Sequence, residues 1–140
     1  MHGKTQWFNY YFDPQFNNTE GCKYWSRVAR EPIQLECPEK FSQNILIVEY
    51  FPYHSIKFKP TKNILPSQKY NGYLVEKAIK RNACVVIMRS VSKWLELVPE
   101  LKHSKHSKYL TLNSSQRGYL SKGNMKRDDY DCFRNKLRSL

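Results

Sequence analysis

Two short runs of apolar, mostly β-branched residues stand out from the rest of the chain. Residues 45–51 (ILIVEYF) and 83–88 (ACVVIM) are almost continuously apolar over the length of a strand. Such runs are typical of strands that are covered on both faces of a parallel sheet. A shorter run at residues 109–112 (YLTL) predicts a third strand.

Helical spacing of apolar residues appears between and after these runs. Residues 68–81 predict a helix with Ser67 as its N-cap, and residues 93–98 predict a shorter helix capped by Ser92. Residues 128–138 place apolar side chains at i, i+3 and i+7 after a group of aspartates, which favour a helix N-terminus. Each predicted strand is therefore followed by a predicted helix.

This alternation predicts the α/β class, as a three-layer α/β/α arrangement around a small, mainly parallel sheet. The 140 residues suit one domain. Residues 45–140 carry the strand–helix repeats, and residues 1–44 form an aromatic-rich lead-in. We expect that lead-in to be irregular apart from a short helix at residues 22–30.

The charge of the chain suggests an anionic partner, which the fold prediction alone does not. Lysine and arginine number 24 against 12 acids, a formal net charge of +12. Between Leu101 and Arg127 the chain has basic residues and no acid. Such a stretch favours contact with a phosphate backbone, in DNA or RNA, although a solvated loop has the same composition. The basic residues of this stretch are Lys102, Lys105, Lys108, Arg117, Lys122, Lys126 and Arg127.

Several classes of protein lack support. The four cysteines form no CxxC pair, so we expect thiols in a reducing, cytoplasmic setting. There is no signal-peptide pattern and no apolar run near the roughly 20 residues of a membrane helix. P-loop, GxGxxG, GxSxG and HExxH motifs are also missing. We therefore predict no cofactor, no metal and no membrane contact.

Polar residues follow the first two predicted strands, where ligands bind in parallel sheets. Glu49 and Tyr50 lie at the end of the first strand, His54 follows it, and Arg89 follows the second. The imidazole of His54 suits contact with a phosphate or general acid–base chemistry. The alternative is that Glu49 and His54 only satisfy backbone groups of the loop.

A third polar segment, Asn113 to Asn124, follows the last predicted strand. It contains small residues, two glycines and two apolar residues, Tyr119 and Leu120. An apolar side chain in such a loop can insert between bases. The alternative is a surface loop in which Tyr119 folds back on the core.

The order of these segments resembles the C-terminal part of the uracil-DNA glycosylase superfamily, and more closely a bacterial and phage branch of glycosylase-like proteins. The resemblance covers roughly residues 20 to 138, and the order and spacing of the segments carry it. The matching segments are LIVEYFPYHS (46–55), LPSQKYNGYLVEKAIKR (65–81), VVIMRSVSKW (85–94), VPEL (98–101) and YLTLNSSQRGYLSKGNM (109–125).

The resemblance implies excision of a base from DNA by hydrolysis of its N-glycosidic bond. It assigns base reading to Glu49, where the uracil enzymes usually have asparagine, with Tyr50 and Arg89 as further pocket residues. Asn113 and His54 become the candidate catalytic residues. The nucleic-acid contacts become Lys102, Lys105, Lys108, Ser114, Ser115, Arg117, Leu120 and Lys122.

Two departures from the family pattern leave a second function open. Asn113-Ser114-Ser115 stands where the family has a His-Pro-Ser type motif. The family's first motif, of the Gly/Asn-x-x-Pro type, has no counterpart here, so we expect a fragment or a natural truncation. The alternatives are a non-catalytic module that binds nucleic acid or protein, and a basic domain whose charge serves solubility alone.

Overall fold

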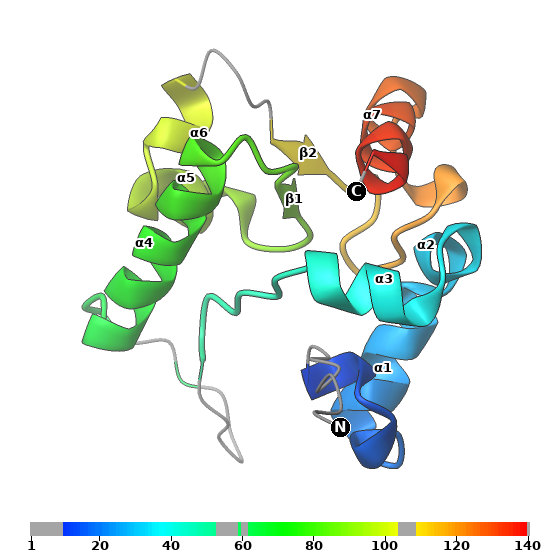
Figure 1. The fold of residues 1–140 in the computed structure, drawn as a ribbon. Helices are drawn as coiled ribbons and strands as arrows, with labels where there is room; N and C mark the ends of the chain where they lie inside the picture. Colours follow the sequence, from blue (N-terminus) through cyan, green and yellow to red (C-terminus); the bar gives the residue numbers. More distant parts are fainter. Residues whose placement is uncertain (1–9, 53–58, 60–61, 104–108, 140) are drawn as a thin grey trace, which may run out of the picture. The chain divides into compact units, whose positions relative to one another are not determined.

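The computed structural model describes residues 10–52, 59, 62–103 and 109–139 (Figure 1). These residues fall into two compact units. We call residues 1–46 with 112–140 the helical unit, and residues 47–111 the α/β unit. The prediction of one domain over all 140 residues stays a prediction.

The helical unit is built from four α-helices and three 3₁₀ turns within the described residues. The helix predicted at residues 22–30 is confirmed as α1, although it begins and ends two residues earlier. The Thr19 Oγ1 caps it by accepting a hydrogen bond from Cys22 N at 3.3 Å. Two further helices follow it, so residues 20–44 are mostly helical, whereas the sequence predicted an irregular segment after the first helix. The helices are α1 (Glu20–Val28), α2 (Arg30–Leu35), α3 (Pro38–Asn44) and α7 (Arg127–Arg138), and the 3₁₀ turns are η1 (Tyr10–Phe12), η2 (Pro14–Phe16) and η3 (Lys122–Asn124).

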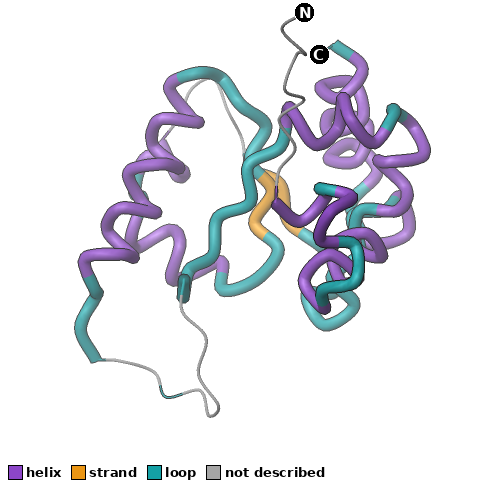
Figure 2. The backbone as a smooth tube through the Cα atoms, turned by 60° about the horizontal axis from the view of Figure 1, so that its bottom comes forward, coloured by secondary structure: helices purple, strands orange, loops and turns teal. Residues whose placement is uncertain are grey.

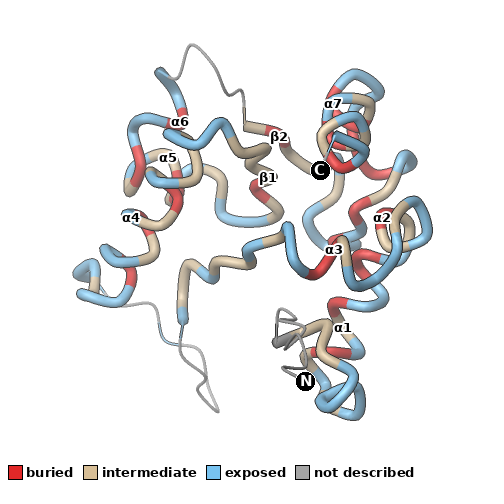
Figure 3. Tube along the Cα trace, viewed as in Figure 1, coloured by how far each residue is buried: buried red, intermediate tan, exposed pale blue. Residues whose placement is uncertain are grey.

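Aromatic and aliphatic side chains from distant parts of the sequence fill the core of this unit. Phe12 and Phe41 meet edge to face with ring centroids 5.3 Å apart. Buried residues lie on α1, α3 and α7 (Figure 3). The buried apolar side chains of the unit are Cys22, Trp25, Val28, Ala29, Phe41, Leu120, Met125, Tyr130, Phe133 and Leu137.

The α/β unit contains a short parallel sheet beside three helices (Figures 1 and 2). Its strands pair with Val86 opposite Leu110 and Ile87 opposite Thr111. The predicted strands at 83–88 and 109–112 are thus confirmed as a parallel pair, although each is shorter than predicted. The elements are α4 (Pro66–Lys80), β1 (Val86–Ile87), α5 (Val91–Leu97), α6 (Glu100–His103) and β2 (Leu110–Thr111).

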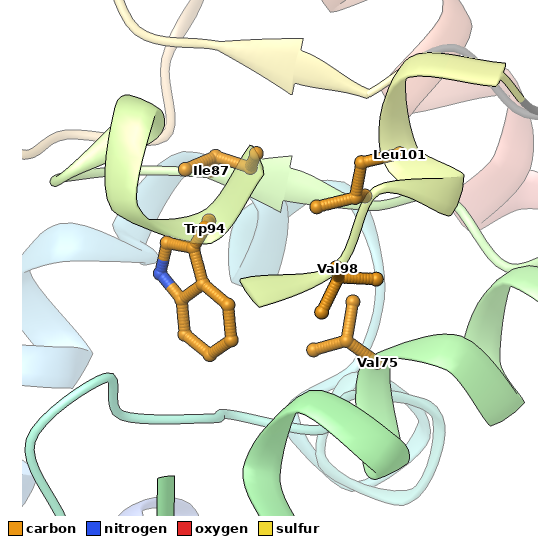
Figure 4. Packing of buried hydrophobic residues seen from close by; sticks show 5 residues of the cluster. All are labelled: Val75, Ile87, Trp94, Val98 and Leu101. Atoms are coloured by element: carbon orange, nitrogen blue, oxygen red, sulfur yellow. The ribbon is translucent and has the colours of Figure 1, made fainter. Parts of the chain in front are cut away.

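One apolar cluster joins these elements. It consists of Val75 from α4, Ile87 from β1, and three residues from the segment from α5 to α6, which are Trp94, Val98 and Leu101 (Figure 4).

Gly72 lets α4 approach this segment closely. A Cβ atom added at Gly72 would lie 3.1 Å from Leu97 Cγ and 3.5 Å from Val98 Cγ2. The glycine that weakens the predicted helix by intrinsic propensity is therefore used for close packing.

Residues 45–51 do not form the predicted strand. The chain has no regular secondary structure there, and β1 and β2 are the only strands among the described residues. Val48 and Tyr50 do pack against the apolar cluster. However, the Glu49 carbonyl accepts from the side chain of Asn71 on α4, with 2.6 Å between Nδ2 and O. Two apolar residues of the run, Val48 and Tyr50, therefore pack on the helices of this unit. The Glu49 carbonyl bonds to a helix side chain instead of a neighbouring strand.

Two helix starts also differ from the prediction. The helix α4 begins at Pro66, and the side chain of Gln68 accepts from the backbone N–H of Leu65 at 2.9 Å. Ser67 therefore lies inside the first turn and is not the cap. The N-cap position of α5 is Ser90, which is in the left-handed conformation (φ 55°) and makes no side-chain capping hydrogen bond, two residues before the predicted Ser92.

Within the described ranges, no helix has the length and apolarity to cross a membrane. The four cysteines, all of them in described positions, form no disulfide.

Truncation of Leu101 should test the apolar cluster. We expect Leu101→Ala to lower the free energy of unfolding by about 2–5 kcal/mol, because it leaves a cavity between α6 and its neighbours. Leu46→Ala removes the same atoms from an exposed position and should change it by less than about 0.5 kcal/mol. Urea titrations of both variants measure this, and equal effects would contradict the described packing.

Candidate nucleic-acid interface

The loop from Asn113 to Asn124, which we call the Asn124 loop, is organised by one buried side chain. The Asn124 carboxamide makes three hydrogen bonds to the backbone of its own loop. Its Oδ1 accepts from Ser114 N at 2.8 Å, and its Nδ2 donates to Ser114 O and to Tyr119 O, both at 3.0 Å. Since a buried amide must be paired, these bonds fix the path of the loop.

Backbone contacts close the loop at its base and in its middle. Leu112 and Met125 form an antiparallel bridge, and Asn113 N donates to Asn124 O at 2.7 Å. Gly118 takes the left-handed conformation (φ 66°), which glycine adopts without strain, and its N–H donates to Ser114 O at 3.3 Å. The 12-residue segment is therefore a compact loop with internal bonding along its length.

The loop is also attached to the helices of its unit. The backbone N–H of Leu120 donates to Val28 O at 3.0 Å, at the end of α1. The backbone N–H of Lys122 donates to the Glu31 carboxylate on α2 at 3.1 Å. The same Glu31 oxygen accepts a short hydrogen bond from the hydroxyl of Tyr130 on α7. One carboxylate thus connects α2, α7 and the loop.

The environment of Tyr130 favours its neutral form. Burial of the side chain, the hydrogen bond to Glu31 and the negative charge of that carboxylate raise the pKa of Tyr130 from 10.0 to about 12, in that order of importance. The hydroxyl therefore remains a donor to Glu31 throughout the physiological range.

On this internally bonded frame the loop exposes polar and basic side chains. Asn113, Ser115 and Arg117 are exposed near its first turn, and Lys122 is exposed near its end. Lys126 and Arg127, at the start of α7, are exposed as well. Since residues 113–127 include no acid, this surface has the charge and the hydrogen-bond donors that contact with phosphate requires.

The structure corrects the assignment of Leu120 as a nucleic-acid contact. Its side chain is 4% exposed and belongs to the core of the helical unit, so it does not present a wedge. Tyr119, 38% exposed, is the large side chain that this part of the loop presents.

Ser114 has a structural position inside the loop. Its N–H and its carbonyl both bond to Asn124, and its Oγ accepts from Arg117 N at 3.4 Å. Of the Asn113-Ser114-Ser115 segment, Asn113 and Ser115 are the residues whose side chains are exposed.

The other predicted site residues lie in the α/β unit or outside the described residues. Glu49 and Lys102 are exposed, and Arg89 is exposed at the residue before Ser90. His54, Lys105 and Lys108 lie outside the described residues.

Tyr50 is half-buried in an aromatic cluster of this unit. Its ring meets Trp94 edge to face at 5.3 Å and Phe51 at 4.9 Å. The Lys93 ammonium lies 5.8 Å from the centroid of Tyr50 and 5.0 Å from that of Phe51. Tyr50 therefore contacts α5 through both Trp94 and Lys93.

Sequence reasoning missed the residues that shape the loop. Asn124 was included only as the last residue of a polar segment, and Glu31 was not singled out. Neither position carries a motif, because its role depends on burial and on partners far away in the sequence. The start of α5 at Ser90 was missed for a related reason, since it depends on the left-handed backbone conformation of this residue.

No group of three or more His, Cys, Asp and Glu side chains suited to a metal ion occurs in the part of the chain that the structure describes. Comparison with protein-family models, with curated proteins and with solved structures gave no match.

Replacement of Asn124 by its isosteric acid should test the loop's internal bonding. We expect Asn124→Asp to lower the free energy of unfolding by about 2–4 kcal/mol, because two carbonyls lose their donor and a carboxylate is buried beside them. Asn18→Asp makes the same change at an exposed position and should have little effect. Thermal unfolding of both variants measures the difference, and an unperturbed Asn124→Asp protein would contradict this account.

The Tyr130 hydroxyl should give a specific dependence of stability on pH. The folded pKa of Tyr130, about 12, exceeds the unfolded value of 10.0, so its contribution is complete below pH 10 and is lost as the pH rises from 10 to 12. We expect the stability of the wild type relative to Tyr130→Phe to fall by up to about 3 kcal/mol as the pH rises from 10 to 12. Urea titrations of both proteins from pH 8 to 11.5 measure it, and a difference independent of pH would refute the assignment.

Proposed function

We propose that this chain is a nucleic-acid-binding domain in which the Asn124 loop contacts the phosphate backbone. The observation that supports this most directly is the loop itself. A buried carboxamide holds it in one conformation, and it exposes Asn113, Ser115, Arg117 and Lys122 with no acid among residues 113–127. The net charge of +12 adds sequence-independent attraction to the same kind of partner.

The proposed contact works by two kinds of donor. Arg117 offers a planar guanidinium that suits two phosphate oxygens, and Lys122 offers a point charge. The exposed Asn113 amide and Ser115 hydroxyl add short-range hydrogen bonds that position the backbone without reading its sequence. Because the loop is already internally bonded, binding orders few additional backbone groups.

The resemblance to uracil-DNA glycosylases extends this proposal to a parent activity. In that family the loop at this place pinches the DNA backbone and stabilises the departing base. We propose base excision from DNA as the activity from which this chain derives, with Glu49, His54 and Asn113 in the roles given above. The parallel pairing of β1 and β2 across α5 and α6 supports the family's three-layer α/β/α architecture, which, with a cytoplasmic location, is part of the proposal.

A non-catalytic interaction module is the second candidate. The exposed side chain of Glu49 favours it, because a residue that reads a flipped base is enclosed by its pocket. Release of uracil from oligonucleotides separates the two candidates. Release that is lost in both Glu49→Ala and Asn113→Ala supports excision, and binding without release supports the module.

Binding should fall with salt and with removal of single loop charges. We expect the affinity of the wild type for a labelled duplex to decrease steeply between 50 and 200 mM salt, on the order of 10-fold or more for each pair of phosphate contacts. Arg117→Gln and Lys122→Gln should each weaken binding and reduce the slope of log K against log salt by about one. Fluorescence anisotropy at several salt concentrations measures both quantities.

A matched control is available on α1. Lys23→Gln removes the same charge from an exposed lysine that is paired with Glu20 at 2.9 Å, and it should leave the slope unchanged. No binding at low salt by folded wild-type protein would reject the proposal. Equal effects of all three substitutions would show attraction by net charge alone and would remove the loop's special role.

A further inference from the structure

One face of α4 exposes two tyrosines on the side of the helix away from the core. Gln68, Gly72 and Val75 are the buried residues of this helix. Tyr70 and Tyr73 are 61% and 47% exposed, and with 100° per residue they point away from that buried side. Large aromatic side chains this exposed contribute little to folding stability, so their position calls for another explanation.

The two rings form a short continuous surface. Their centroids are 6.4 Å apart with an angle of 36° between the ring planes. The Lys77 ammonium lies 4.8 Å from the centroid of Tyr73, one helical turn further on. The stripe Tyr70–Tyr73–Lys77 therefore joins two exposed rings with a positive charge that lies over one face of Tyr73, which leaves the Tyr70 ring as the more accessible of the two for stacking.

The charges around the stripe define the partner. Lys69, Lys77, Lys80 and Arg81 are exposed along and just after α4, and Glu76, the acid within residues 66–81, is half-buried. An anionic partner is therefore favoured at this face. A partner that also covers tyrosine rings must carry flat, stackable groups on an anionic chain.

We propose that this face of α4, defined by Tyr70, Tyr73 and Lys77, binds a single-stranded segment of nucleic acid by stacking of its bases. Single strands leave base faces accessible, whereas a duplex covers them within its own stack. An acidic peptide would satisfy the lysines but would offer the rings no comparable flat group. This site is separate from the Asn124 loop, and it adds base-dependent affinity to the backbone contact proposed above.

The test compares three probes of equal length: a single-stranded oligonucleotide, the same strand with abasic residues at internal positions, and a blunt duplex. The wild type should bind the normal strand at least about fivefold more tightly than the abasic strand, which is the lower bound for one stacked base. Tyr70→Ala and Tyr73→Ala should each reduce that preference, and the double variant should abolish it. Tyr70→Phe keeps the ring and should retain it.

The controls distinguish stacking from loss of exposed apolar surface. Ile64→Ala removes an exposed aliphatic side chain from the same unit and should leave the preference for the normal strand unchanged. Binding of the duplex should be nearly unaffected by the tyrosine substitutions. Circular dichroism confirms that the variants remain helical, which is expected because both rings are exposed.

Two results would overturn the inference. One is equal affinity of the wild type for the normal and abasic strands. The other is displacement of the oligonucleotide by polyglutamate with the same dependence on Tyr70, which would indicate an acidic peptide partner.

The same titrations keep the two proposals apart. Failure of the loop proposal would appear as an unchanged salt slope in Arg117→Gln and Lys122→Gln, whatever the tyrosine variants do. Failure of the α4 proposal would appear as an unchanged base preference in Tyr70→Ala and Tyr73→Ala, whatever the loop variants do.

Discussion

The buried carboxamide of Asn124 is the interaction on which the proposed interface depends. An amide removed from water without partners costs about 1–3 kcal/mol per unpaired group, so its three bonds to Ser114 and Tyr119 restrict the backbone to conformations that satisfy them. Gly118 supplies the one left-handed residue that the turn needs. These backbone bonds fix the Cα positions from which the exposed side chains project. A flexible loop of the same composition would not hold those positions.

Backbone satisfaction also explains the largest difference between the predicted and observed fold. An apolar, β-branched run such as residues 45–51 has the same pattern whether it pairs with a strand or lies across helices. In the structure Tyr50 packs on Trp94, and Asn71 donates to the Glu49 carbonyl. Val48 and Tyr50 of this segment pack against the apolar cluster, whereas Leu46 is exposed. The apolar pattern carried no information on which partner would take the segment's backbone groups, because that partner lies on α4.

Elements that are determined by neighbouring residues in the sequence were predictable. Features that depend on contacts between residues far apart in the sequence were not. The helix after Thr19, the helix around Val75 and the strand pair of Val86 with Leu110 follow from caps, periodicity and apolar runs. Helices α2 and α3 are only six and seven residues long, too short for periodicity to show. The composition of residues 113–124 was enough to predict a loop, whereas the role of Glu31 depends on contacts with Lys122 and Tyr130 about a hundred residues away.

Charge and stacking make different physical demands on a partner. A surplus of twelve positive charges attracts any polyanion, and salt screens that attraction, so it provides affinity without selectivity. Selectivity requires short-range contacts to chemical groups that one partner has and another lacks. Tyr119 on the loop, and Tyr70 with Tyr73 on α4, are exposed rings in basic surroundings, and a ring gains from a base face but not from a phosphate. In the complexes proposed above, selectivity for accessible bases depends on these rings, while the lysines and arginines set only the strength of attraction.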